Sequence, residues 1–586
     1  MKLRGSLKVN GIGWSAFLPV VPVILLLVLY WPGLNTWFYQ DDFGWLNLRH
    51  DVHSVRDLAG ALLAPKAHGN MRPLGENAYW LTISWLFGAE PLPFHIAAFL
   101  TQAASLVLLF AIVRRLTESA AAAFGAQVLW MVNIGLAPAL GWSSIYNQVL
   151  SGFFFLLGFY FMLRRNWTAH WIAFVLGLGA LEINVVYPAV AGVYALLYAP
   201  ALLKKITPMF ALSAIAVFAH FYFAPPSTVG VYAPRIDGRI FGTLWTYWTW
   251  ALGPMPVWLA LGVTAGVSVL IASGARAAIL GLAWFAIPLL PYLPLPEHRM
   301  DYYLAVPAIG IAMLGGSALL QAREWRGPRR MLAAACVLIC VTVYLAASVT
   351  ASSVITRWQH ARGERVEDLV LGVVEARQLA PEKIILLDGI DTDLFWSGVA
   401  DLPFRALGIP RVYLSPGAAI RIQAAPELLS KYTLPAAIAG RAVQAGTAVL
   451  YRFDGRLLHR AAGAVMPSEG EPHFVNLADD VFRDYIGAGW RDAPGGYRSM
   501  NGSATVRIGG ARAATEKLYI GIFETRAFRL GVRANGVELP VELARRDNDL
   551  SEFRASLPAA AMGWEQMEIV LSADGGSLVF GYLEVR

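Results

Sequence analysis

The sequence has few charged residues and almost no cysteine. Only 15% of its 586 residues are Asp, Glu, Lys or Arg, whereas 57% are hydrophobic, and the mean hydropathy is +0.51. These values exclude an ordinary soluble protein of this length and indicate a chain that crosses a membrane several times. The two cysteines, Cys336 and Cys340, share one apolar run. Their spacing excludes a disulfide framework and favours two positions on one helix face.

Apolar runs long enough to span a bilayer recur along residues 1–352. They lie at about 15–33, 93–113, 119–137, 145–163, 168–181, 184–203, 206–224, 255–273, 278–295, 302–320 and 331–352. Taking each run as one helix gives about eleven spans and predicts a polytopic α-helical membrane protein. The first run follows Lys2, Arg4 and Lys8, and no small-residue cleavage site comes after it, so we expect it to be retained.

Basic residues mark the cytoplasmic side of this arrangement. Arg114/Arg115, Arg164/Arg165 and Lys204/Lys205 all fall on the side shared with the N-terminus. The positive-inside rule therefore places the N-terminus in the cytoplasm, and an odd number of spans places everything after about residue 353 outside it. The net charge of +7 follows this topology, so membrane lipids and not nucleic acid are the expected partners. The expected location is the bacterial inner membrane.

The composition beyond residue 353 is that of a soluble module. Stretches such as "EKIILLDGIDTD" and "PRVYLSPG" predict short buried strands in a small α/β unit over 353–463. Alternating stretches such as "ATVRIGG", "LYIGIF", "MEIVLSA" and "LVFGYLEVR", with turns at "ANG" and "ADGGS", predict a β-sandwich over 470–586. Both domains are expected to be extracytoplasmic, and the sandwich is a candidate carbohydrate-binding domain by fold-level analogy.

Acidic, basic and aromatic residues collect in the connections predicted to face outward. The first connection, 34–92, contains "YQDDFGW" with Asp41 and Asp42, and two amphipathic pieces able to lie in the interface plane, "VRDLAGALL" and "ENAYWLTISWLF". Later outward turns carry Glu182 in "GALEINVVYP", "VYAPRIDGR", and "PEHRMDYY". One membrane face therefore holds the chemically versatile residues.

The order of these motifs resembles the GT-C superfamily of integral-membrane glycosyltransferases, in particular its protein-mannosyltransferase and aminoarabinose-transferase-like branch. The resemblance covers roughly residues 15–310 and is carried by "WFYQDDFGWL", the segment beginning "RPLGENAYWL" and continuing through "PFHIAAFL", "LGALEINVVYP" and "HRMDYYLAVPAIG". It implies transfer of a sugar from a polyprenyl-phosphate carrier to an extracytoplasmic acceptor, which could be a glycan, a lipid or a protein.

Such an inverting displacement needs a carboxylate to take the acceptor's proton and cations to stabilise the departing phosphate. The resemblance places Asp41 in the position of the base and Asp42 in the second acidic position, where many relatives have Glu. It also matches Glu182 but not the Lys that often precedes it, since this chain has Leu181. The expected substrate- and phosphate-binding residues are Arg72, Glu182, His298, Arg299, Tyr303 and His68. A divalent cation, Mg²⁺ or Mn²⁺, on Asp41 and Asp42 is also compatible with oxygen ligands.

Simpler interpretations of these residues remain open. Either aspartate could cap the helix that starts near Phe43. Glu182 could be a turn residue, and Arg72 and Arg299 could extend toward headgroups. His50, His53 and His68 could be interfacial polar groups, and "DGIDTD" a solvated turn. Trp490 and Tyr497 could stack on sugars or belong to the sandwich core.

Other functions remain open as well. A flippase or transporter of lipid-linked sugars would also need many helices and an intramembrane charged cavity, but such proteins tend to carry charges near the midplane. An oligosaccharide ligase or polymerase would share the lipid-phosphate chemistry, and a non-catalytic scaffold would use only the outer domains. The clustering of charge at one face favours an enzyme.

Overall fold

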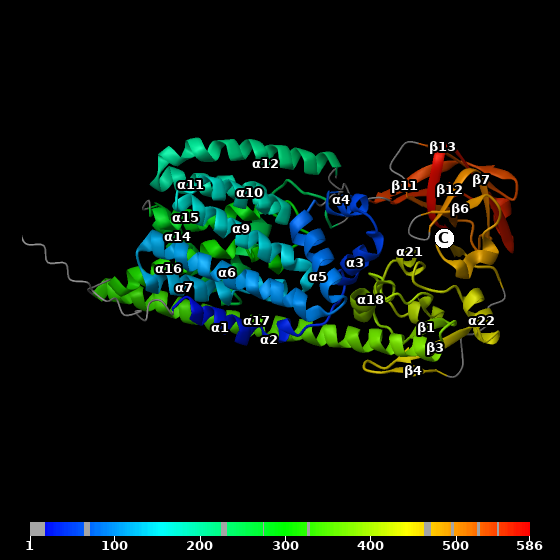
Figure 1. The fold of residues 1–586 in the computed structure, drawn as a ribbon, viewed down its shortest axis with the longest axis horizontal. Coiled ribbons are helices and arrows are strands. Elements are labelled where there is room, and N and C mark those ends of the chain that lie inside the picture. The colour runs from blue at the N-terminus through cyan, green and yellow to red at the C-terminus, as the bar shows by residue number, and fades with distance from the viewer. Residues whose placement is uncertain are drawn as a thin grey trace, which may run out of the picture. The chain divides into compact units, whose positions relative to one another are not determined.

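The computed structural model describes residues 18–63, 71–223, 231–272, 275–324, 328–461, 470–493, 497–523, 528–547 and 550–586. They belong to two compact units, Met1–Glu364 and Arg365–Arg586. The first unit is helical, whereas the second contains all the strands of the described residues. Figure 1 labels the elements of both units.

Each apolar run predicted from the sequence contains a helix of the first unit. These helices are α1 (Val20–Leu29), α6 (Pro91–Thr117), α7 (Ala120–Met131), α9 (Tyr146–Leu163), α10 (Trp167–Ala180), α11 (Tyr187–Tyr198), α12 (Leu203–Phe223), α14 (Val257–Ala272), α15 (Arg276–Leu289), α16 (Ala308–Glu324) and α17 (Pro328–Leu379). In Figure 1, α6, α10 and α12 run nearly parallel, and α9 packs against both α6 and α10.

Four helical stretches among the described residues are long and apolar enough to cross a membrane. They are Pro91–Thr117, Ser143–Leu163, Pro200–Phe223 and Met331–Leu379. These stretches indicate an integral membrane protein. The other apolar helices are 10–17 residues long, which is short of the ~20 residues that cross a bilayer at 1.5 Å per residue. The count of about eleven spans therefore stays a prediction.

Short elements form the connection between α1 and α6. They are α2 (Trp31–Leu34), α3 (Asp42–Asn47), η2 (Leu48–Asp51), α4 (Val55–Leu63), η4 (Pro73–Ala78) and α5 (Tyr79–Phe87). The two amphipathic pieces recognised in the sequence are thus the helices α4 and α5. Further short elements follow later in the unit: α8 (Leu136–Gly141), η5 (Ser143–Ile145), η6 (Glu182–Val186), η7 (Pro200–Leu202), α13 (Arg239–Ala251) and η8 (Asp301–Leu304). The sequence did not predict α13, a Trp-rich helix directly after the "VYAPRIDGR" turn.

Helix α17 continues well beyond the predicted end of the last span at residue 352. It is 52 residues long, and the two units divide within it, between Glu364 and Arg365. The composition becomes more polar near residue 353, but no helix-breaking residue occurs at that point. The polar segment therefore continues the same helix. Gly363 is needed there, because a Cβ atom would lie 2.9 Å from the backbone N and O of Trp37.

A four-stranded sheet with the order β2-β1-β3-β4 begins the second unit. Its strands are β1 (Ile384–Asp388), β2 (Val412–Leu414), β3 (Ala448–Phe453) and β4 (Leu458–Arg460), and β1 pairs in parallel with β2 and β3. Helices α18 (Thr392–Gly398), α19 (Pro403–Ala406), α20 (Pro416–Ala419), α21 (Pro426–Leu429) and α22 (Ala436–Gln444) connect them. The interpretation of "DGIDTD" as a solvated turn does not hold for Asp388. This residue is buried and accepts hydrogen bonds from Arg421 and Arg452.

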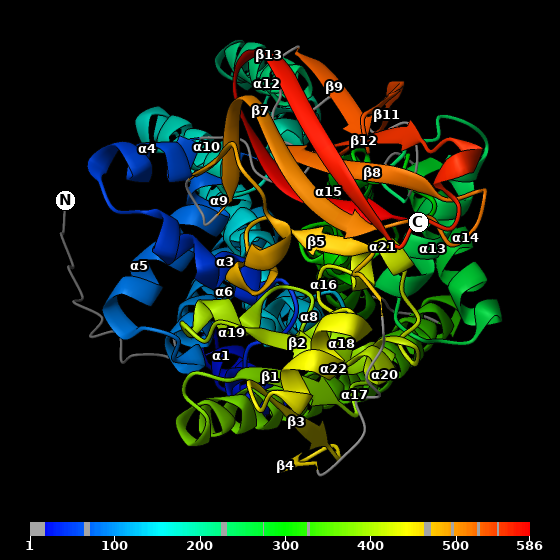
Figure 2. The same cartoon turned by 90° about the vertical axis from the view of Figure 1, so that its right-hand side faces the viewer.

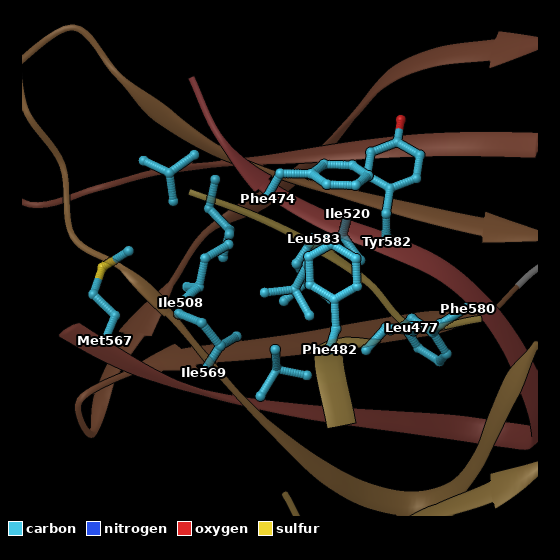
Figure 3. Close-up of a cluster of buried hydrophobic side chains, with 14 of the residues drawn as sticks. Phe474, Leu477, Phe482, Ile508, Ile520, Met567, Ile569, Phe580, Tyr582 and Leu583 are labelled. Atoms are coloured by element: carbon cyan, nitrogen blue, oxygen red, sulfur yellow. The ribbon is translucent and has the colours of Figure 1, made fainter. Parts of the chain in front are cut away.

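The C-terminal strands form one hydrogen-bonded sheet. They are β5 (Phe474–Asn476), β6 (Trp490–Asp492), β7 (Arg498–Gly509), β8 (Lys517–Phe523), β9 (Arg529–Ala534), β10 (Val537–Leu539), β11 (Val541–Asp547), β12 (Leu550–Ser556) and β13 (Gln566–Val585). One edge of β13 pairs with β7 along most of its length, whereas its other edge pairs first with β9 and then with β8 (Figure 2). Its apolar side chains, including Ile569 and Phe580, enter the core shown in Figure 3.

The stretch "ADGGS" is not the turn that the sequence predicted. It lies inside β13, so "MEIVLSA" and "LVFGYLEVR" are one 20-residue strand and not two. The register against β7 shifts between Ala573 and Leu578. The glycines therefore accommodate an irregularity in the ladder, which is another common use of glycine within strands. The "ANG" turn is as predicted, with positive φ at Asn535 and Gly536 between β9 and β10.

Candidate active site

The segment that leads to the acidic pair is held by buried polar contacts. Nε2 of His95, on α6, lies 2.9 Å from the carbonyl oxygen of Thr36. Gln40 has a positive φ of 57°, and its side-chain oxygen accepts a hydrogen bond of 3.2 Å from Arg362 of α17. These contacts fix the turn that delivers Asp41 and Asp42 to the start of α3.

Asp42 is a buried carboxylate with its acceptor positions largely occupied. One oxygen accepts hydrogen bonds from the backbone N–H and hydroxyl of Ser144, at 2.8 and 2.6 Å, and the other accepts the N–H of Tyr39 at 3.2 Å. Only 1% of the residue is exposed. Burial raises the pKa of Asp42 to about 8, although the Ser144 and Tyr39 hydrogen bonds oppose the shift. This residue ties α3 to the η5 turn and is poorly placed to receive a substrate proton.

Asp41 has the opposite environment. Asp41 is exposed, and no side chain in the described part of the protein donates a hydrogen bond to its carboxylate. It occupies the N-cap position of α3 without making a side-chain capping bond, which argues against the interpretation of Asp41 as a simple cap. The surrounding protein still raises the pKa of Asp41 by removing water from around it. An accessible carboxylate with a raised pKa is suited to accept a proton.

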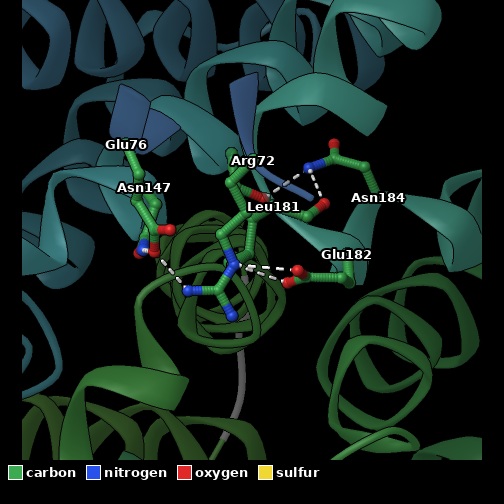
Figure 4. Close-up of polar contacts among 7 residues, drawn as sticks. Arg72, Glu76, Asn147, Leu181, Glu182 and Asn184 are labelled. Carbon is green, nitrogen blue, oxygen red and sulfur yellow. Dashed lines mark hydrogen bonds and ion pairs between the residues drawn. The ribbon is translucent and has the colours of Figure 1, made fainter. Parts of the chain in front are cut away.

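Arg72 lies between two glutamates, as Figure 4 shows. Its Nε donates to both carboxylate oxygens of Glu182, at 2.9 and 2.7 Å, and its Nη1 donates to Glu76. Glu76 also accepts a 2.7 Å hydrogen bond from Asn147 of α9. Burial raises the pKa of Glu76, and the charge of Arg72 opposes that shift. The Arg72 guanidinium is therefore already compensated by carboxylates and differs from a free phosphate-binding cation.

A π-helical turn presents Arg72 and Glu76 to this network. Residues Pro73–Ala78 form η4, and such turns are frequent at functional sites. Gly75, inside the turn, lies directly against α10, since a Cβ atom there would be 2.1 Å from the carbonyl oxygen of Ala180. Glu182 follows Ala180 by two positions at the start of η6. The close approach at glycine thus brings η4 within reach of Glu182.

Aromatic residues from two outward connections form a second part of the site. The rings of Tyr232 and His298 lie 4.3 Å apart, and Tyr303 stacks on Tyr292 at 3.8 Å. The N–H of Arg235 donates to the carbonyl oxygen of Pro294 at 2.7 Å, which joins the two connections.

Electrostatic effects link this aromatic group to the acidic residues. Burial raises the pKa of Tyr232, the charge of Asp41 raises it further, and the charge of Arg72 lowers it. The charge of Asp41 also contributes to the raised pKa of Tyr302. The charges of Asp41 and Arg72 therefore both act on the Tyr232 hydroxyl. Among the predicted residues, Arg72 contacts Glu182, and the rings of His298 and Tyr303 lie 6.0 Å apart. That these four residues and Asp41 form one site stays a prediction.

The other predicted site residues have different surroundings. Arg299 is exposed and donates a 3.1 Å hydrogen bond to Thr246 of α13, and no carboxylate among the described residues forms an ion pair with it. His68 lies outside the described residues. The Nε of Arg49 lies 3.4 Å from Nε2 of His50.

Several residues of the site were not recognised from the sequence. Ser144 donates to Asp42, and Asn147 donates to Glu76. Both come from the polar stretch "SSIYNQ", which covers η5 and the start of α9. A polar stretch at the start of a membrane helix is unusual and was a signal in the sequence. Arg362 lies over the ring of Tyr39 at 5.6 Å, and Tyr39 stacks on Trp142 at 5.6 Å. Arg362 gave no signal, because it is one of many polar residues in the last part of α17.

The acidic pair offers one readily available carboxylate to a metal ion. Among the described residues, no group of three or more His, Cys, Asp or Glu side chains could hold a metal ion. Asp42 already accepts three hydrogen bonds, which leaves Asp41 as the one readily available carboxylate of the pair. Mg²⁺ is usually held by one or two carboxylates, with water and substrate phosphate completing its shell, so Asp41 is the ligand that this pair would offer to such an ion.

Comparisons with known proteins give distant structural similarities. No protein-family profile and no curated protein matches the sequence. ArnT from Cupriavidus metallidurans bound to undecaprenyl phosphate is similar with 12% identity and a TM-score of 0.40, over 94% of this chain and 100% of that one. The arabinofuranosyltransferase AftD from Mycobacteria has 14% identity and a TM-score of 0.41, over 98% of this chain and 60% of that one.

An oligosaccharyltransferase from Archaeoglobus fulgidus, tethered with an acceptor peptide, has 10% identity and a TM-score of 0.36, over 78% of this chain and 75% of that one. At these identities, what the chain does must follow from its own residues.

Proposed function

We propose that this protein is a membrane glycosyltransferase that moves a sugar from a polyprenyl-phosphate carrier to an extracytoplasmic acceptor, with Asp41 as the catalytic base. The observation that carries the proposal is the contrast within the acidic pair. Asp42 is buried and bonded to Ser144 and Tyr39, whereas Asp41 is accessible and has a raised pKa. The order of motifs, which resembles the GT-C superfamily, supports the same assignment.

In this mechanism the Asp41 carboxylate accepts the proton of the acceptor hydroxyl as that oxygen attacks the anomeric carbon. The bond from the anomeric carbon to the phosphate oxygen breaks, and the electron pair leaves with the lipid phosphate. The configuration at the anomeric carbon inverts. The raised pKa strengthens Asp41 as a base, because a carboxylate of higher pKa takes the proton more readily.

The leaving phosphate needs cationic stabilisation, and Arg299 is the best candidate for it. Arg299 is exposed and has no carboxylate partner among the described residues. Arg72 is engaged by Glu76 and Glu182, so we assign it mainly to positioning, with only its second terminal nitrogen left to donate. His298 and Tyr303, with Tyr232, offer aromatic faces for the sugar ring, and ring stacking suits sugars because their C–H faces are apolar.

The proposal also includes an orientation in the membrane. The site faces the extracytoplasmic side, as does the unit that follows α17, and the N-terminus is cytoplasmic. The acceptor, the donor sugar and the part played by a divalent ion are further questions for the same experiments. Lipid-linked sugar is the donor class that this orientation requires, because nucleotide sugars are not available outside the cytoplasm.

The decisive experiment compares cells with the intact protein, with Asp41→Asn and without the protein, by mass spectrometry of lipid-linked sugars and envelope glycans. We expect Asp41→Asn to insert normally, to accumulate the sugar-loaded carrier and to lose the glycan product. Asp57→Asn, at a partly exposed aspartate of α4, is the matched control and should behave as the unchanged protein. Normal glycan with Asp41→Asn at equal protein level would remove Asp41 as the base. Carrier trapped on the cytoplasmic leaflet would instead identify a flippase.

A further inference from the structure

A polar cleft in the C-terminal sheet region has no part in the proposed membrane site. It has a volume of about 580 Å³ and is lined by Ala478, Asp480, Arg483, Ile486, Gly487, Trp490, Asp492 and Arg498. Small-ligand sites typically have volumes of about 300–1,000 Å³, and this cleft is more polar than most of them. All eight lining residues belong to the second unit.

The polar groups of the cleft are held in place by one arginine. Arg498 of β7 is the cross-strand partner of Asp492 of β6, and its guanidinium donates to that carboxylate and, at 3.1 Å, to Asp480 of η9 (Asp480–Tyr485). The side chains of Asp480 and Asp492 are 65% and 87% exposed. The second oxygen of each carboxylate accepts no hydrogen bond from a described residue, so both remain available as acceptors.

Arg483, also of η9, supplies donors on the same cleft. It is exposed, and its side chain makes no hydrogen bond or ion pair with any described residue. Two aspartates and two arginines balance in charge. A charge-balanced set of acceptors and donors suits a neutral ligand with many hydroxyl groups, since each hydroxyl both donates and accepts.

Trp490 forms the aromatic wall and is fixed in orientation. Its indole N–H donates to the carbonyl oxygen of Thr505 at 2.8 Å, and its ring meets Phe580 edge-on at 5.3 Å. Alternation along β6 places Trp490 and Asp492 on one face of the strand. The adjoining loop lies tightly on β7, because a Cβ atom at Gly487 would be 2.0 Å from the Thr505 hydroxyl, and Gly489 has a positive φ of 93°. A rigid ring is thus presented beside oriented carboxylates.

We propose that this cleft binds neutral sugar residues of a glycan acceptor. The proposal rests on the proposed function for the identity of the ligand as acceptor, but the binding itself depends only on the cleft. Trp490 contacts the apolar face of a pyranose or furanose ring, Asp480 and Asp492 accept from its hydroxyls, and Arg483 donates to them. The predicted core role of Trp490 and this binding role are compatible, because one edge of the ring packs while the residue also lines the cleft.

The test is binding of the full-length purified protein to fluorescently labelled short linear oligomers of mannose, glucose, galactose and arabinose. We expect saturable binding of at least one oligomer, weakened about tenfold or more by Asp492→Ala and by Arg483→Gln. Glu542→Gln is the matched control, since Glu542 is also an exposed sheet carboxylate paired with an arginine, Arg554, and it should not change binding. Trp490→Phe, which keeps an aromatic ring against Phe580, should weaken binding while leaving thermal unfolding near normal.

The same measurement on Asp41→Asn separates this inference from the proposed function. Binding should persist in Asp41→Asn, because the cleft and Asp41 belong to different units. Absence of binding to every oligomer, or unchanged binding in Asp492→Ala and Arg483→Gln, would overturn the cleft as a glycan site and leave the transferase proposal intact. Normal transfer by Asp41→Asn would overturn the base assignment and leave a demonstrated glycan cleft intact.

Discussion

Adjacent residues of the same type have different roles when their surroundings differ. Asp41 and Asp42 cannot be told apart in the sequence, which shows only that both follow an apolar run. Their roles differ because of Ser144, about a hundred positions away, whose backbone N–H and hydroxyl both donate hydrogen bonds to Asp42. Three hydrogen bonds and complete burial make Asp42 a structural carboxyl. The accessible Asp41 is left as the reactive one.

The raised pKa of Asp41 predicts the pH dependence of transfer. A general base works in its ionised form, so the rate should rise with pH through the pKa of Asp41 and fall on acidification. Because the surrounding protein raises this pKa, the acidic limb should have its midpoint above the ordinary value of about 3.9 for Asp. The initial rate of transfer from a polyprenyl-phosphate sugar, measured across pH, checks this. A rate that stays constant down to about pH 4 would contradict it, and Asp57→Asn should leave the profile unchanged.

Ser144→Ala should destabilise the protein in a pH-dependent manner. Asp42 has a pKa of about 8 in the fold and about 3.9 when unfolded, so the folded state holds this proton more tightly. The contribution of Asp42 to stability is therefore complete below about pH 4 and is lost as the pH rises toward 8. Above that, the ionised carboxylate depends on the 2.6 Å hydroxyl bond, and its loss should cost about 1.5–3 kcal/mol.

Thermal unfolding of the detergent-solubilised protein measures this effect. The drop in Tm caused by Ser144→Ala should be larger at about pH 9 than at about pH 6. Ser268→Ala is the control, since that exposed hydroxyl bonds only to the carbonyl oxygen of Thr264 within its own helix. Equal drops at both pH values would show that the Ser144 hydroxyl does not support the ionised form of Asp42.

Single elements in the first unit serve to place charged side chains, and η4 is the clearest case. The π-helical turn puts Arg72 and Glu76 on one side, where they meet Glu182 and Asn147 (Figure 4). Both glutamates come from elements other than a long span, so their pairing depends on how closely η4 approaches the end of α10. A partly buried ionic network of this kind adds little net stability, but removal of one partner is costly.

Gly75→Ala tests this placement. Its Cβ would lie 2.1 Å from the Ala180 carbonyl oxygen, and backbone cannot yield as a flexible side chain can. We expect a loss of about 3 kcal/mol in unfolding free energy, at the upper end for overpacking, together with loss of transfer because η4 and Arg72 move. Tm and transfer activity measured on the same preparation check both effects.

Gly60→Ala on α4 is the matched control for that substitution. Nothing lies within 4 Å of a Cβ atom at Gly60, and alanine is the better helix former, so stability should be unchanged or slightly higher. Gly75→Ala protein that unfolds at the normal temperature would show that η4 can be displaced without cost. The close approach would then not be what holds Arg72 near Glu182.

At the scale of the molecule, the sequence predicted what local patterns encode. Each predicted apolar run contains a helix, although α13 was not predicted, and alternation located β7, β8, β9 and β13 but not β5, β6 or β12. It failed where a feature depends on partners. The "ADGGS" stretch has turn chemistry but lies within β13, because β7, β8 and β9 provide continuous pairing along it. The last span has no local stop signal at residue 352, so α17 extends to Leu379. The shared face of Asp41, Arg72 and Glu182 followed from topology, whereas the Arg72 ion pairs required the fold.

The orientation of the whole chain is the remaining assumption behind the proposed function, and labelling can test it. Cys336 and Cys340, both free and both in α17, are first replaced by serine so that single reporters can be added. An odd number of spans places Glu542 of β11 and Asp57 of α4 outside the cytoplasm, and places Glu118, at the exposed turn after α6, inside it. An impermeant maleimide applied to spheroplasts should label Glu542→Cys and Asp57→Cys at once, and Glu118→Cys only after lysis. Immediate labelling of Glu118→Cys, or protection of Asp57→Cys, would place Asp41 on the cytoplasmic face, where a lipid-phosphate sugar donor would no longer be the required substrate.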